Sequence, residues 1–181
     1  MKRTLGSNLV LTGFMGSGKT EVGRATAGLL SRPFVDTDEL IVAGAGMGVS
    51  EIFAKEGEPG FRAREAEAVE EVAERQGQVI ALGGGAVLAV ENRTLLKMSG
   101  LLVYLRATPE TLMRRVETGE DRPLLAHGDR AARLRDLVAV RTPIYEAVAD
   151  FVIDTDSTDV RRVAEEIVRW FTARVQEIRR R

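Results

Sequence analysis

A glycine-rich loop near the N-terminus carries the residues best suited to chemistry. The segment Leu11–Arg24 reads LTGFMGSGKTEVGR and contains the complete G-x-x-x-x-G-K-[ST] pattern. Glycines let successive backbone N–H groups turn toward an anion, and the positive end of the following helix adds to that attraction. The pattern therefore predicts a site for the phosphates of ATP. The residues expected to contact ATP here are Gly13, Gly16, Ser17, Gly18, Lys19 and Thr20.

Within this loop, two side chains have distinct expected roles. Lys19 should reach the β- and γ-phosphates, and the Thr20 hydroxyl should ligate Mg²⁺. The match is specific for nucleotide binding because an apolar stretch precedes it and a helical pattern follows it. It does not report which reaction follows.

Two aspartates follow the second apolar stretch, in FVDTDEL. Many P-loop hydrolases hold Mg²⁺ with an aspartate at the end of another core strand, but the third apolar stretch, QVIALGGGAV, ends in glycines. Asp36 and Asp38 are separated by one residue, so in an extended chain both side chains point to the same face. We expect Asp36 to hold Mg²⁺, directly or through water, and Asp38 to face the phosphoryl acceptor. Asp38 is explained equally well as a helix N-cap.

Two arginines and a run of glycines could bind a small anion. Arg62 is one helical turn from Glu65, and Arg141 lies near the end of a predicted helix, so each could be purely structural. Gly83–Gly85 follows the third apolar stretch and permits close approach of a ligand to bare backbone. Guanidinium groups together with exposed N–H groups would suit a small carboxylate.

Composition limits the class of protein. The 181 residues most simply form one domain, 1–181, and the contents of 44% hydrophobic and 29% charged residues are ordinary for a soluble globular chain. The formal net charge of −1 gives no overall attraction to nucleic acid or an anionic membrane. The absence of cysteine excludes disulfides and thiol chemistry, and it is consistent with the cytoplasm. The first apolar run is too short for a signal peptide or a membrane span.

The elements that must position these residues alternate along the chain. Predicted strands cover Leu9–Phe14, Phe34–Asp36, Val79–Leu82, Leu101–Leu105 and Phe151–Ile153. Predicted helices cover Lys19–Leu30, Val49–Glu56, Phe61–Arg75, Glu91–Met98, Pro109–Thr118 and Arg130–Ala147, with a last one from about Thr158 to the end. This order predicts a parallel sheet with helices on both faces, which binds ligands beyond the carboxyl ends of its strands. Residues 39–76 form a long, mostly helical excursion, interpreted as a substrate-binding region. Residues 118–129, TGEDRPLLAHGD, are interpreted as a mobile lid.

Six segments together resemble the shikimate kinase family: GFMGSGKTEVGR, FVDTDELI, IFAKEGEPGFRARE, ALGGGAV, DRPLL and RTPIYEAVADFVIDT. They occur in the family's order through nearly the whole chain. The resemblance implies an α/β, P-loop nucleoside-monophosphate-kinase-like three-layer sandwich with a five-stranded parallel sheet, a substrate-binding insertion and a lid. It also implies transfer of the γ-phosphate of ATP, with Mg²⁺, to the 3-hydroxyl of shikimate. The products would be shikimate 3-phosphate and ADP, a step toward chorismate and the aromatic amino acids, in a cytoplasmic and monomeric protein.

The resemblance also implies roles for individual residues. Asp38 would hydrogen-bond the ring hydroxyls of shikimate and could accept the proton from the attacking one. Asp36 would lie near Mg²⁺, Glu65 would orient the binding arginine, and Arg115 would lie near adenine. Arg122 in the lid would close on the phosphates and act in catalysis with Lys19 and Asp38. The shikimate carboxylate and ring would be contacted by Phe53, Phe61, Arg62, Gly84, Gly85 and Arg141.

Two other interpretations stay open at this point. The first is a related gluconate-type P-loop kinase, against which the paired arginines argue because they favour a carboxylate with ring hydroxyls. The second is an ATP-binding regulatory module without turnover, against which the intact catalytic set argues. The basic C-terminal helix is interpreted as a solvated face rather than a nucleic-acid site. His127, the sole histidine, is given no role.

Overall fold

A five-stranded parallel sheet organises the part of the chain that the structure describes. The computed structural model describes residues 7–117, 129–156 and 159–180. The strands lie in the order β2-β3-β1-β4-β5, and every neighbouring pair is parallel. Their bounds are β1 Asn8–Thr12, β2 Phe34–Asp36, β3 Val79–Ala81, β4 Gly100–Arg106 and β5 Phe151–Asp154. All five predicted strands are therefore confirmed, with β2 at the predicted bounds and the ends of the others within two residues.

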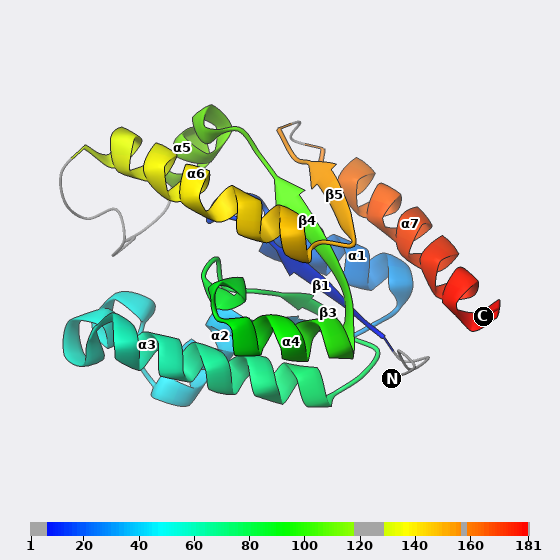
Figure 1. Cartoon of the computed structure of the whole chain (residues 1–181), viewed down its shortest axis with the longest axis horizontal. Coiled ribbons are helices and arrows are strands. Elements are labelled where there is room, and N and C mark those ends of the chain that lie inside the picture. The colour runs from blue at the N-terminus through cyan, green and yellow to red at the C-terminus, as the bar shows by residue number, and fades with distance from the viewer. Residues whose placement is uncertain (1–6, 118–128, 157–158, 181) are drawn as a thin grey trace.

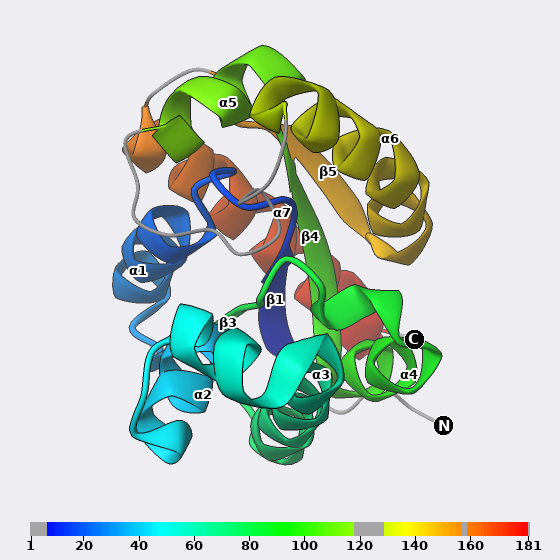
Figure 2. The ribbon, with the colours of Figure 1, turned by 90° about the vertical axis from the view of Figure 1, so that its left-hand side faces the viewer.

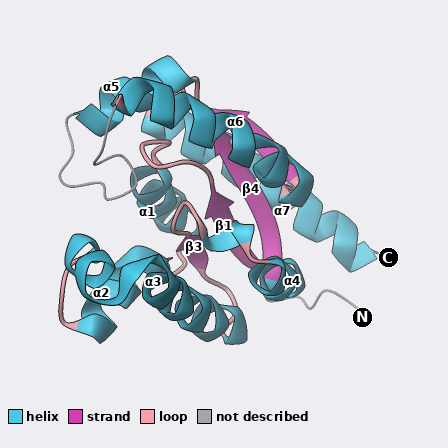
Figure 3. Ribbon diagram, turned by 60° about the vertical axis from the view of Figure 1, so that its left-hand side comes forward, coloured by secondary structure: helices cyan, strands magenta, loops and turns pink. Residues whose placement is uncertain are grey.

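Helices cover both faces of this sheet and make three layers (Figures 1 and 3). Their bounds are α1 Lys19–Leu30, α2 Thr37–Ala45, α3 Val49–Glu74, α4 Val90–Ser99, α5 Pro109–Glu117, α6 Arg130–Val148 and α7 Val160–Arg180, with a short 3₁₀ turn at Ala86–Leu88. One hydrophobic cluster joins α1 and α7 to one face of the sheet. A second cluster joins α3, α4, α5 and α6 to the other face. The predicted three-layer α/β class is confirmed.

The excursion over residues 39–76 is helical, as predicted, but its details differ from the prediction. No helix was expected directly after Asp36, whereas α2 begins at Thr37. The Asp36 carboxylate caps this helix by accepting a 3.0 Å hydrogen bond from the Asp38 backbone N–H. The helix N-cap is therefore Asp36, and the suggestion that Asp38 is the cap is wrong. Asp38 lies in the first helical turn, so the extended geometry expected for this pair is also wrong.

The two helices predicted on either side of Gly57 are joined in α3. Gly57 has φ 70° and ψ −179°, a non-helical conformation that separates α3 into two helical parts, as the two predicted helices require. Figure 2 shows α2 and α3 side by side at one end of the sheet. A small hydrophobic cluster packs them together through Ile41, Ile52 and Phe61. This pair of helices stands beside the carboxyl ends of β1 and β3.

At the amino ends of the strands, opposite the phosphate loop, Asn8 joins β1 to the end of α3. Its side chain is fully buried. Its Nδ2 donates to the Arg75 carbonyl at 2.7 Å and the Val72 carbonyl at 3.3 Å, and its Oδ1 accepts from the Gln78 N–H at 3.0 Å. The contacts fix where α3 turns into β3. No helix in the described ranges is both long and apolar enough to cross a membrane.

Candidate active site

The loop between β1 and α1 has the backbone that the glycine pattern predicted. Gly13, Gly16 and Gly18 have φ values of 146°, 81° and 90°, which residues with a side chain rarely adopt. Gly18 is the N-cap of α1, and no side chain caps this helix end. The N–H groups of the first turn are therefore directed at the space where an anion would bind.

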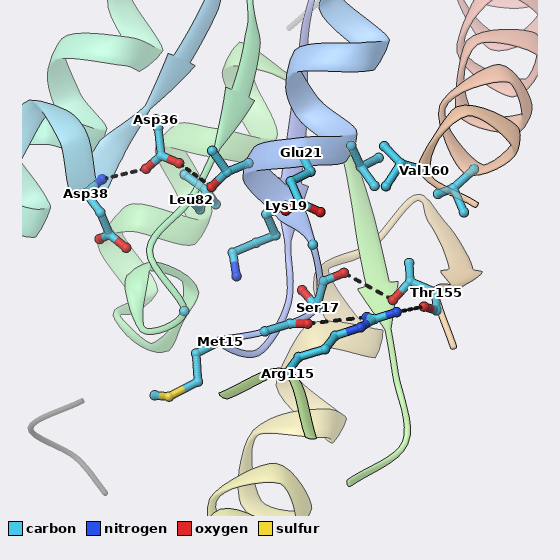
Figure 4. Close-up of a pocket in the computed structure, with 16 residues that line it drawn as sticks. Met15, Ser17, Lys19, Glu21, Asp36, Asp38, Leu82, Arg115, Thr155 and Val160 are labelled. Atoms are coloured by element: carbon cyan, nitrogen blue, oxygen red, sulfur yellow. Dashed lines mark hydrogen bonds between the residues drawn. The ribbon is translucent and has the colours of Figure 1, made fainter. Parts of the chain in front are cut away.

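Two contacts from distant elements brace this loop. The Thr155 hydroxyl donates a 3.1 Å hydrogen bond to the Ser17 carbonyl. Arg115 donates from Nη1 to the Gly16 carbonyl at 3.3 Å and from Nη2 to the Thr155 carbonyl at 2.5 Å (Figure 4). Arg115 was expected near adenine, and the structure places it against the phosphate loop. Thr155 was not identified from the sequence, because its contact with Ser17 spans 138 residues.

A cleft of about 420 Å³ opens at this loop. Figure 4 shows that its walls combine the phosphate loop with the acidic segment after β2 and with the segment after β5. The predicted residues among its lining are Gly16, Ser17, Gly18, Lys19, Thr20, Asp36, Asp38, Gly84 and Arg115. Lys19 Nζ donates a 3.0 Å hydrogen bond to the Phe14 carbonyl, so its ammonium group lies over the loop.

Thr20 and Asp36 are hydrogen-bonded to each other at the N-terminus of α1. Thr20 Oγ1 donates a 2.7 Å hydrogen bond to Asp36 Oδ2, and Asp36 is only 8% exposed. A hydroxyl and a carboxylate beside a phosphate loop suit Mg²⁺, which keeps several waters and takes its other ligands from phosphate. In the described ranges no group of three or more acidic or histidine side chains could hold a metal by itself. The donor set therefore fits a nucleotide-bound Mg²⁺ rather than a protein-only cage.

The glycines after β3 form the boundary between this cleft and a second site. A Cβ on Gly84 would lie 3.5 Å from the Met15 nitrogen and 3.6 Å from the Gly13 oxygen, so Gly84 packs on the phosphate loop. A Cβ on Gly83 would lie 2.6 Å from Asp38 Oδ1 and 3.0 Å from a Glu65 carboxylate oxygen. The acidic groups of α2 and α3 are therefore in close contact with the glycine run.

Arg62 and Glu65 form an ion pair on α3. Arg62 Nη1 lies 2.7 Å from Glu65 Oε2, and Arg62 Nη2 lies 3.0 Å from Glu58. Glu65 is 2% exposed, and its other oxygen, Oε1, has no hydrogen-bond partner among the described residues. Burial raises the pKa of the Glu65 carboxyl, and the charge of Arg62 opposes that rise. The charge of Asp38 adds to it.

Arg141 approaches the same group from α6. It is 5% exposed, and its guanidinium carbon lies 5.7 Å from the centre of the Phe14 ring. Its charge lowers the pKa of Glu65, as the charge of Arg62 does. No ion pair joins Arg141 to a carboxylate within the described part of the chain. A buried cation of this kind is suited to an anionic ligand.

Two aromatic side chains complete the surroundings of Arg62. The rings of Phe53 and Phe61 are 4.7 Å apart and tilted by 34°, and the guanidinium carbon of Arg62 lies 5.5 Å from the Phe61 ring centre. The structure therefore brings the predicted substrate-binding residues together around Glu65 and the glycine run. Arg122, His127 and the predicted lid up to residue 128 lie outside the described residues, and Asp129 caps α6.

The phosphate loop and the arginine site, formed by Arg62 and Arg141, meet at the carboxyl ends of β1, β2 and β3. Gly84 contacts the phosphate loop, while the next residue, Gly85, packs against Arg62. A nucleotide hydrolase has no need of a second anion site beside its phosphate loop. A phosphate loop with buried arginines beside it is the arrangement expected of a P-loop phosphotransferase with an anionic small-molecule acceptor.

Comparison with known proteins names the family. A family model described as shikimate kinase matches residues 15–172. A shikimate kinase from Symbiobacterium thermophilum is 52% identical over 164 residues, which cover 89% of this chain and 94% of the relative. A solved structure of shikimate kinase from Acinetobacter baumannii in complex with shikimate has a TM-score of 0.90 and 40% identity, covering 93% of this chain and 94% of that one. The chain belongs to the shikimate kinase family.

A more distant likeness concerns the gluconate-type interpretation. A gluconokinase from Sinorhizobium meliloti has a TM-score of 0.59 and 16% identity, covering 96% of both chains. Likeness at this level shows a shared fold alone. It gives no support to gluconate as the acceptor.

Proposed function

We propose that this chain transfers the γ-phosphoryl group of ATP to the 3-hydroxyl of shikimate, giving shikimate 3-phosphate and ADP. The observation that carries the proposal is the position of the glycine run, which packs on the phosphate loop at Gly84 and on Arg62 at Gly85. In a chain of the shikimate kinase family, this arrangement would bring an acidic acceptor beside the terminal phosphate of the donor.

The nucleotide side of the site would hold ATP by backbone N–H groups and Lys19. Thr20 and Asp36 would hold Mg²⁺, which neutralises phosphate charge when bound. Arg115 already binds the Gly16 carbonyl, so it would fix the loop as well as lie near adenine. Arg122, outside the described residues, stays a prediction from the sequence as the group that closes on the phosphates.

The acceptor side would recognise shikimate by its charge and its ring hydroxyls. Arg62, Arg141 and the backbone of Gly84–Gly85 would bind the carboxylate. Phe53 and Phe61 would contact the ring. The buried Glu65 would orient Arg62 through their 2.7 Å ion pair.

Asp38 would meet the hydroxyl that attacks ATP. Its carboxylate lies against Gly83 in the boundary between the two sites, and it also lines the nucleotide cleft. An ionised Asp38 would accept the hydroxyl hydrogen and orient the oxygen toward the phosphorus. In phosphoryl transfer the protein contributes mainly by positioning the reactants and stabilising charge. Orienting the hydroxyl is therefore the larger part of the role of Asp38. We propose a cytoplasmic setting and a monomer on the basis of family membership.

A substrate panel tests the function directly. The purified chain is incubated with ATP, Mg²⁺ and one of shikimate, shikimate methyl ester, gluconate or a nucleoside monophosphate, and ADP formation is followed. We expect rapid turnover with shikimate, a strongly raised KM with the methyl ester, and a monophosphorylated product by mass spectrometry. Faster turnover with gluconate would replace the acceptor. ATP binding without turnover of any compound would make the chain a nucleotide-binding module.

A further inference from the structure

Tyr145 is a buried tyrosine to which the sequence analysis gave no role. It lies on α6, one helical turn after Arg141, and is 1% exposed. Its hydroxyl donates a 2.6 Å hydrogen bond to the Gly84 carbonyl, a contact between residues 61 positions apart. Tyr145 is thus tied to the glycine run that separates the nucleotide and acceptor sites.

The same hydroxyl also interacts with Arg141. A side-chain hydrogen bond from Arg141 and the charge of Arg141 oppose the effect of burial on the Tyr145 pKa. Burial dominates and raises this pKa to about 12, so the hydroxyl keeps its proton at neutral pH. The Tyr145 hydroxyl therefore donates to the Gly84 carbonyl and lies close to the charge of Arg141. The hydroxyl thus stands between the Arg141 side chain and the glycine run.

The bond to the Gly84 carbonyl fixes more than one atom. The carbonyl of Gly84 and the N–H of Gly85 belong to one planar peptide group, and in a trans peptide they point in opposite directions. No cis peptide is found among the described residues. Holding the oxygen toward Tyr145 therefore holds the Gly85 N–H away from α6. Gly85 is also the residue against which Arg62 packs.

The Tyr145 ring is itself held by the sheet. It stacks on Tyr104 with ring centres 5.1 Å apart and planes inclined by 28°. Tyr104 belongs to β4, where it pairs with Thr12 of β1. Thr12 directly precedes the phosphate loop. Through this stack the hydroxyl has a fixed position relative to both ligand sites.

We propose that Tyr145 is a positioning residue of the acceptor site, whose hydroxyl orients the Gly84–Gly85 peptide and the Arg141 guanidinium toward one carboxylate. The proposal rests on the proposed function, because shikimate supplies that carboxylate. Tyr145 acts without touching the acceptor or the nucleotide. Its effect should therefore appear in acceptor recognition and be absent from nucleotide recognition.

Tyr145→Phe tests this because it keeps the ring and its stacking and removes the hydroxyl alone. We expect the KM for shikimate to rise roughly tenfold, in line with the loss of a hydrogen bond that leaves the Gly84 carbonyl without its side-chain partner. The KM for ATP should stay within twofold. The matched control is Tyr104→Phe, which removes a hydroxyl from the stacked partner. The Tyr104 hydroxyl interacts with Thr142 and not with the glycine run. Both KM values should therefore stay within twofold.

Shikimate methyl ester separates positioning from a general loss of packing. Because the ester has no charged carboxylate, Tyr145→Phe should lower kcat/KM much less for the ester than for shikimate. An equal loss with both compounds, an unchanged KM for shikimate, or a parallel rise in the KM for ATP would overturn the proposal. Shikimate binding by calorimetry supplies the same comparison if turnover is too slow. Failure of the wild-type chain to phosphorylate shikimate would instead overturn the proposed function.

Discussion

Arg62 packs directly against the Cα atom of Gly85. A Cβ at this position would lie 2.6 Å from the guanidinium carbon of Arg62 and would overlap its Nη1 atom. Gly85 has φ −100°, which any residue can adopt, so the backbone alone does not require glycine. The need for glycine comes from the guanidinium group that occupies the place of a side chain.

Gly85→Ala should therefore displace Arg62 without unfolding the chain. Arg62 can move because the overlap involves the far end of a flexible side chain. We expect the KM for shikimate to rise roughly tenfold, with the KM for ATP within twofold and the melting temperature nearly unchanged. Gly28→Ala is the control, because nothing lies within 4 Å of a Cβ there and alanine favours the helix by about 1 kcal/mol. An unchanged KM for shikimate in Gly85→Ala would separate Arg62 from acceptor binding.

Arg62→Ala should weaken shikimate binding by about 10- to 100-fold, the usual cost of removing a hydrogen-bonded charge. ATP binding, measured by calorimetry, should be largely retained. Arg64→Ala is a matched control on the same helix, since Arg64 is paired with Glu56 at 2.8 Å and contacts no predicted substrate residue. If Arg62→Ala weakened ATP binding instead, the assignment of the carboxylate site would be wrong.

Thr20→Val should raise the free Mg²⁺ concentration needed for half-maximal activity, while Thr20→Ser should behave like the wild type. Valine has the shape of threonine without the hydroxyl that bonds to Asp36 at 2.7 Å. Loss of a partner near a metal typically costs about 10- to 100-fold in metal affinity. Nucleotide binding without Mg²⁺ should be the same in all three proteins. Identical Mg²⁺ dependence in Thr20→Val would remove Thr20 from the metal site.

The raised pKa of Glu65 predicts a dependence of stability on pH. A carboxyl with a raised folded-state pKa binds its proton more tightly in the folded chain than in the unfolded one. Its contribution to stability is complete below the ordinary glutamate pKa of about 4.3 and is lost as the pH rises through the raised value. The melting temperature of the wild type minus that of Glu65→Gln should therefore fall as the pH rises from about 4 toward neutrality. A difference that grows with pH would contradict this.

Asn8→Ala should lower the free energy of unfolding by about 1–3 kcal/mol, because it removes the side-chain partner of the Arg75 carbonyl and of the Gln78 N–H, while the Val72 carbonyl keeps its hydrogen bond from the Gln78 side chain. Asn8 is at the amino end of β1, whereas both ligand sites are at the carboxyl end. The KM values for ATP and shikimate should therefore stay within twofold. Urea unfolding measures the change in stability, and steady-state kinetics measure the KM values. A selective loss of shikimate binding would contradict a purely structural role for Asn8.

Local patterns explain which parts of this molecule were predictable. The phosphate loop is formed by consecutive residues with a specific pattern, and the strands are short apolar runs. Both could therefore be predicted from the sequence. The start of helix α2 was predicted only as one of two alternatives, and at Asp38 rather than Asp36, because two aspartates separated by one residue also resemble a metal-binding pair in a strand. The two aspartates support either structure, and only the folded chain decides between them.

Contacts across the sheet explain the residues that were missed. Tyr145 meets Gly84 across 61 residues, and Thr155 meets Ser17 across 138. Neither residue belongs to a local pattern that signals such a bond, since tyrosine in a helix and threonine after a strand are ordinary. Family resemblance identified the residues expected to touch ligands, whereas those that support them became visible only from the packing.

The bend at Gly57 divides α3 into two parts with different duties. Phe53 precedes the bend, whereas Arg62 and Glu65 follow it, on the part that Val69 and Val72 anchor in the main core. Contacts cross the bend, however: the Phe53 and Phe61 rings lie 4.7 Å apart, and Arg64 is paired with Glu56 at 2.8 Å. Because these contacts link the two parts, a substitution before Gly57 that changes the apolar surface would also act on the segment that carries Arg62, so redesign of this region for a larger or smaller acceptor would need matched changes on both sides of the bend.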